Sequence, residues 1–130
     1  MKTSSLFLTF LLLFVFIACE SDTVGLTQEQ EQSVLNQKRA EIESLATSVV
    51  CTDPSVWVYT GIGGKACGGP TGYIAYSTSI NVGEFLQKVE EFTLAEDNFN
   101  KKWNIKSDCS VPPQPIGINC ENGQAVLVFP

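Results

Sequence analysis

The chain has 130 residues and a formal charge of −6, from 8 basic and 14 acidic side chains. This length allows one domain. An acidic chain without a block of Lys and Arg is a poor binder of nucleic acid, because neutralising phosphates requires clustered basic side chains. The sequence contains no histidine, which excludes Ser-His and Cys-His nucleophile pairs and most catalytic zinc sites.

Residues 1–18 have the organisation of a signal peptide. Lys2 supplies a short positive start, and a mainly apolar run extends from Leu6 to Ala18. The run has 13 residues, well short of the roughly 20 that cross the hydrocarbon core as a helix. A permanent transmembrane anchor is therefore the weaker alternative.

The end of this segment, Phe16-Ile17-Ala18-Cys19, resembles the lipobox of bacterial lipoproteins. The resemblance implies cleavage before Cys19, lipidation of Cys19 with palmitate-type chains, and attachment to a membrane of the cell envelope. Acidic residues follow at once in Glu20-Ser-Asp22, as in the surface-export signals of Bacteroidota lipoproteins, so an outer-membrane and surface-exposed location is expected. The alternative is an ordinary secretory signal that leaves Cys19 as a free thiol.

Four cysteines remain when Cys19 is set aside, an even number that suits disulfides in an oxidising compartment: Cys51, Cys67, Cys109 and Cys120. Three connectivities are open. We favour pairing the first two and the last two, because each of these bonds closes a short loop around one irregular segment. A zinc site is disfavoured since no C-x₂-C pair occurs, and no metal or cofactor is expected.

Residues 19–26 are expected to form a flexible tether, and residues 27–130 a single small domain. Thr27 with Gln30 forms a capping-box pattern that predicts a helix from about Gln28. The helix should end near Val49 or Val50, before Asp53-Pro54. Its apolar side chains recur at three- and four-residue spacing: Val34, Leu35, Ile42, Leu45, Ala46 and Val49.

A second helix is predicted from Asn81, an N-cap residue with Glu84 three positions on, to about Trp103. One face of this helix is apolar: Val82, Phe85, Leu86, Val89, Phe92, Phe99 and Trp103.

Two pairs of strands complete the predicted fold. Residues 56–60 and 72–77 are β-branched and aromatic and should pair across a glycine-dense connection, while residues 116–118 and 125–129 flank the turn signal Asn122-Gly123. The expected class is α+β: two amphipathic helices packed on a small antiparallel sheet of about four strands, stapled by disulfides.

The sequence gives little support for an enzyme or a nucleotide-binding protein. Gly61-x-Gly63-x-x-Ala66 matches a dinucleotide fingerprint, but Cys67-Gly-Gly-Pro70 cannot begin the helix that this site requires. No nucleotide is therefore expected. A hydrolase using carboxylates of the second helix is the least favoured alternative, its candidate residues being Glu90, Glu91, Glu96 and Asp97.

Two segments are candidates for binding an extracytoplasmic protein or peptide. Prolines hold residues 110–118 extended at low entropic cost, and Pro112-Pro113-Gln114 resembles the loops of Bowman–Birk-type protease inhibitors. The alternative is a stiff connection into the last hairpin.

Aromatic side chains on the first two strands form a second candidate, a platform made by Trp57, Tyr59, Tyr73 and Tyr76, although such residues more often pack one face against helices.

The segments Cys67-Gly-Gly-Pro-x-Gly-Tyr-Ile-Ala-Tyr-Ser77, Ser107-Asp-Cys109 and Cys120-Glu-Asn-Gly123 resemble a small exported domain of Bacteroidota lipoproteins without an assigned activity. This resemblance covers about residues 50–129 and implies a cysteine framework and a surface location, with no catalytic residue. The preferred hypothesis is therefore a non-enzymatic, membrane-anchored binding or structural module, and inhibition of a protease through residues 110–118 is the alternative.

Overall fold

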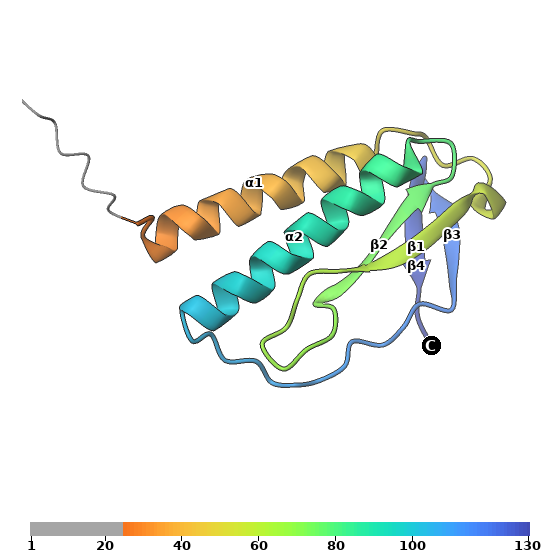
Figure 1. Cartoon of the computed structure of the whole chain (residues 1–130). Helices are drawn as coiled ribbons and strands as arrows, with labels where there is room; N and C mark the ends of the chain where they lie inside the picture. The colour runs from red at the N-terminus through yellow and green to blue at the C-terminus, as the bar shows by residue number, and fades with distance from the viewer. Residues whose placement is uncertain (1–24) are drawn as a thin grey trace, which may run out of the picture.

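The computed structural model describes residues 25–130 (Figure 1). The expected signal peptide, Cys19 and most of the expected tether lie outside the described residues. The elements follow the order α1 (Gln28–Ala46), the 3₁₀ turn η1 (Pro54–Val56), β1 (Trp57–Ile62), β2 (Gly72–Ser77), α2 (Val82–Lys102), β3 (Gly117–Glu121) and β4 (Gln124–Val128). The predicted α+β class is confirmed.

The start of α1 is the predicted capping box. The Thr27 hydroxyl accepts the Gln30 backbone N–H, and the Gln30 side chain accepts the Thr27 N–H. The helix ends at Ala46, about three residues before the predicted end. Hydroxyl groups explain the early end, because Thr47 donates to the Glu43 carbonyl and Ser48 to the Leu45 carbonyl, so side chains satisfy the last turn.

The predicted limits of α2 are confirmed. Asn81 caps its N-terminus by accepting the Glu84 N–H, and Trp103 is the C-cap residue. Lys101 and Lys102 occupy the last turn, where positive charge is favourable next to the helix dipole.

The two helices lie side by side and run in opposite directions (Figure 1). Their buried faces meet the β1–β2 hairpin, which contributes Ile62 and Tyr76 to the core. Two predicted core positions are wrong, since Val34 is 41% exposed and Leu86 is 38% exposed. The buried core consists of Leu35, Ile42, Ala46, Ile62, Tyr76, Phe85, Val89, Phe92 and Phe99.

The four strands form two separate two-stranded antiparallel sheets, rather than one sheet of four. In the first, Trp57 is opposite Ser77 and Ile62 is opposite Gly72. The predicted terminal hairpin is confirmed, and its turn residues Asn122 and Gly123 have φ values of +51° and +80°, as a two-residue type I′ turn requires. Strand β4 lies beside β2 without pairing with it.

The favoured disulfide connectivity is wrong. The bonds join Cys51 to Cys120 and Cys67 to Cys109, with Cα–Cα distances of 5.3 and 5.4 Å, so the second bond is nested within the first. Strand β1, which spans about 20 Å at 3.3 Å per residue, lies between Cys51 and Cys67, whereas a disulfide tolerates only roughly 7 Å between Cα atoms. The proline-rich residues 110–116 separate Cys109 from Cys120 in the same way.

The connection between β1 and β2 is fixed to α2 through two glycines. The Gly63 N–H donates to Thr93 Oγ1 at 3.1 Å and the Gly64 N–H donates to Glu96 Oε2 at 2.8 Å. Gly63 has a φ of +80°, and a Cβ at Gly64 would lie 3.0 Å from the Thr93 carbonyl oxygen. Glycine is therefore needed at both positions for the connection to approach the helix.

Replacing Phe92 with Ala should lower the free energy of unfolding by about 3–5 kcal/mol, because its ring is 2% exposed in the core. Leu94→Ala, in the same helix and 56% exposed, is the matched control and should cost less than about 1 kcal/mol. Urea denaturation measures both values, and equal losses for the two variants would contradict this core.

Candidate functional site

An irregular segment of residues 105–116, here called the strap, connects α2 to β3 and runs past the β1–β2 connection (Figure 1). It is held at several points. The Cys67–Cys109 disulfide fixes its first half. In its second half the Tyr59 hydroxyl donates to the Pro115 carbonyl at 2.9 Å, and the Ile116 N–H donates to the Val128 carbonyl at 2.8 Å. The strap is therefore ordered by its contacts, without secondary structure of its own.

A polar cluster supports the disulfide. The Lys65 ammonium, on a side chain only 16% exposed, donates to Asp108 Oδ1 at 3.2 Å and to both oxygens of Ser110. Hydrogen bonds from the hydroxyl and N–H of Ser110, followed by the Lys65 contact, lower the pKa of Asp108 below its usual value. Because Asp108 is exposed, the ion pair positions the strap more than it stabilises the fold.

The predicted binding residues of the strap lie on its outer side. Pro113 and Gln114 are exposed and Pro112 is half-buried, whereas Pro115 is buried beneath them. Two apolar neighbours are also open to solvent, since Val111 is 83% exposed and Ile116 is 69% exposed. The strap thus presents apolar and proline side chains from a backbone that is fixed at both ends.

The aromatic residues of β1 and β2 do not form one platform. Directly opposite residues of an antiparallel pair share a face, so Trp57, Tyr59 and Tyr73 lie on one face and Tyr76 lies on the other, in the core against Phe85. Tyr59 and Tyr73 meet edge to face at 5.8 Å and stay half-buried. Trp57 is only 7% exposed, which leaves the two tyrosines as the accessible part.

The acidic residues of α2 divide between solvent and structural contacts. Glu90 and Glu91 are exposed, Glu96 accepts the Gly64 N–H, and Asp97 forms an ion pair with Lys101. Within residues 25–130, no group of three or more His, Cys, Asp or Glu side chains is placed to hold a metal ion.

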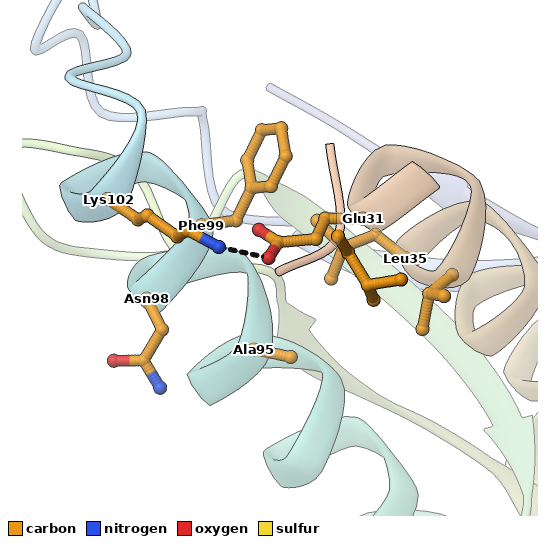
Figure 2. A pocket seen from close by; sticks show the side chains of 8 residues that line it. Glu31, Leu35, Ala95, Asn98, Phe99 and Lys102 are labelled. Atoms are coloured by element: carbon orange, nitrogen blue, oxygen red, sulfur yellow. Dashed lines mark hydrogen bonds and ion pairs between the residues drawn. The ribbon is translucent and has the colours of Figure 1, made fainter. Parts of the chain in front are cut away.

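A cavity that the sequence did not predict lies between the first turns of α1 and the last turns of α2 (Figure 2). We call it the helix-end cleft. Its volume is about 260 Å³. Its walls are mainly apolar, with polar side chains at the rim, and it is lined by Leu26, Glu31, Val34, Leu35, Ala95, Asn98, Phe99 and Lys102.

Glu31 joins the two helices at the rim of the helix-end cleft. Its carboxylate accepts hydrogen bonds from the Lys102 ammonium and, at 2.7 Å, from the Trp103 indole N–H. These bonds, that from Lys102 first, lower the pKa of Glu31. Glu31 and Trp103 are 72 residues apart, so only the antiparallel pairing of the helices brings them together, and no local pattern signals the contact.

Comparison of the chain with protein-family models, with curated proteins and with solved structures gave no significant match. Among the helices of residues 25–130, none is long and apolar enough to span a bilayer.

The Glu31 contacts predict a pH-dependent stability. A carboxyl whose pKa is lowered by folding stabilises the folded state above its unfolded pKa, and this contribution is lost as pH falls through the folded value. The ordinary value is 4.5, so the stability advantage of the wild type over Glu31→Gln should be present at pH 7 and should shrink below pH 4.5. Urea denaturation across this range measures the advantage.

The matched control for this experiment is Glu29→Gln, which removes a carboxylate from the same first turn of α1. If the two substitutions have the same effect at every pH, the interhelical role of Glu31 is refuted.

Proposed function

We propose that the protein is an extracytoplasmic lipoprotein, in which lipid chains on Cys19 hold a small non-enzymatic binding module at the cell envelope. The observation that carries this proposal is the pairing of the cysteines. Cys51, Cys67, Cys109 and Cys120 are consumed in two disulfides, which form and persist in oxidising compartments. The fifth cysteine is the one in the lipobox-like segment.

The position of α1 is compatible with this anchor. The domain begins at Thr27, directly before α1, while the β3–β4 hairpin lies toward the opposite end of the helix pair, where α1 ends and α2 begins (Figure 1). A lipid at Cys19 would therefore leave the hairpin and the part of the strap that leads into β3 directed away from the membrane. A Bacteroidota-type outer-membrane location is part of the same proposal.

The strap is the proposed partner-binding surface, together with the neighbouring Tyr59 and Tyr73. A fixed backbone reduces the conformational entropy lost on binding. The exposed side chains of Val111, Pro113, Gln114 and Ile116 suit an extracytoplasmic protein or peptide partner. A binding role without catalysis is further supported by the absence of histidine from the sequence and by the structural contacts of Glu96 and Asp97.

The second candidate function is inhibition of an extracytoplasmic protease through the strap. It is favoured by one observation: Ser110, Val111, Pro113 and Gln114 are exposed between two fixed points, the disulfide at Cys109 and the buried Pro115. A segment held extended in this way can occupy a protease cleft at low entropic cost.

The anchor is tested by expressing the full chain in a bacterium that processes lipoproteins. Intact mass should show loss of residues 1–18, acyl groups on Cys19 and two disulfides, and the protein should sediment with membranes. Non-reducing peptide mapping should recover the Cys51–Cys120 and Cys67–Cys109 peptides. The control Cys19→Ala should lack the acyl mass, and a wild-type protein with residues 1–18 retained and no acyl group would refute the anchor.

The strap is tested by capture of partners from the native envelope and by titration against a panel of serine and cysteine proteases. Val111→Asp should reduce partner capture at least about tenfold, a cost of roughly 1.4 kcal/mol, because it places a charge on the exposed apolar strap. Val50→Asp, at a site 67% exposed outside the strap, is the control and should leave capture unchanged. Inhibition of a protease by the wild type, lost in Val111→Asp, would support the second function.

A further inference from the structure

The helix-end cleft is lined mainly by apolar side chains. Its walls come from Val34 and Leu35 of α1 and from Ala95 and Phe99 of α2 (Figure 2). Val34 is 41% exposed, although it lies next to the buried Leu35. An apolar cavity with exposed apolar side chains at its mouth gains free energy when apolar atoms fill it.

The two charged side chains that line the cleft neutralise each other. Lys102 and Glu31 pair with each other at the rim, and Glu31 also accepts the Trp103 N–H. A free fatty acid would bring an uncompensated carboxylate to this rim. A neutral, amide- or ester-linked acyl chain would not, so the charges favour an acyl chain without an ionised headgroup.

The position of Leu26 brings such a chain within reach. Leu26 lines the cleft and follows Cys19 by seven residues, a stretch that spans at most about 25 Å at 3.6 Å per residue. Any lipid on Cys19 is thus attached within about 25 Å of the cleft, and its chains are neutral at their linkages.

We propose that the helix-end cleft is a seat for one of the acyl chains on Cys19 of the same molecule. This inference rests on the proposed lipidation of Cys19. A buried methylene gains a similar free energy in a bilayer and in an apolar cavity, and a bilayer accepts all chains over their whole length. The cleft therefore holds a chain while the protein is away from a membrane and releases it to the membrane on contact.

Photo-crosslinking of the acylated full-length protein tests the seat. Asn98→p-benzoylphenylalanine places the probe at the exposed rim, and Leu86→p-benzoylphenylalanine places the control probe on an exposed side chain 12 residues away, toward the other end of the same helix. In detergent-free solution the rim probe should join the acylated peptide that begins at Cys19 at least tenfold more often than the control probe. Addition of phospholipid vesicles should reduce this product.

Equal crosslinking yields at the two probe positions would overturn the seat. Adducts between the rim probe and added phospholipid, formed in place of adducts with the Cys19 chains, would also overturn it. Intact mass is measured first, so that a missing acyl group is recognised as failure of the proposed anchor.

A second measurement keeps the cleft testable without the anchor. Decanoyl-N-methylglucamide, a neutral amide-linked acyl compound, should bind the Cys19→Ser chain below its micellar concentration. Val34→Asn should weaken this binding at least tenfold relative to Leu94→Asn. If the Cys19→Ser chain does not bind the compound, or if Val34→Asn and Leu94→Asn weaken binding equally, the cleft is not an acyl site.

Discussion

The nesting of one disulfide within the other determines which parts of this small domain stay together. Two-stranded hairpins are marginally stable in isolation, and the structure has two of them that share no hydrogen-bonded edge. The Cys51–Cys120 bond joins the terminal hairpin to the segment before β1, and the Cys67–Cys109 bond joins the glycine connection to the strap. With sequence separations of 69 and 42 residues, either bond alone stabilises by about 4 kcal/mol on the chain-entropy estimate.

Local chemistry made much of the fold predictable. The Thr27 and Asn81 caps, the end of α2 and the Asn122-Gly123 turn depend on side chains a few residues apart, and all were predicted. The end of α1 was missed because the pattern of apolar residues continues to Val49, whereas the hydroxyls of Thr47 and Ser48 end the helix. The disulfide pairing was predicted wrongly because the prediction compared only the number of residues in each loop. It did not consider that extended segments within a loop hold its two cysteines apart.

The features of the candidate binding surfaces also differ in whether the sequence predicts them. The exposure of Pro113 and Gln114 follows from an irregular, proline-rich sequence. The burial of Trp57 does not follow from the sequence. The alternation of side chains along β1 places Trp57 on the same face as Tyr59, but it does not reveal that one end of this face is covered. The helix-end cleft exists only because the first turn of α1 meets the last turn of α2, and a contact between Glu31 and Trp103 leaves no trace in either local sequence.

The arrangement of the covalent links also decides what happens when the backbone is cut. A peptidase that cleaves beside Val111 or Gln114 would act on exposed residues of the strap that lie between Cys109 and Cys120. Both products would stay attached, because Cys120 of the C-terminal product remains joined to Cys51 of the N-terminal product. A nicked molecule would thus keep its terminal hairpin, and the strap can be hydrolysed without dismantling the domain.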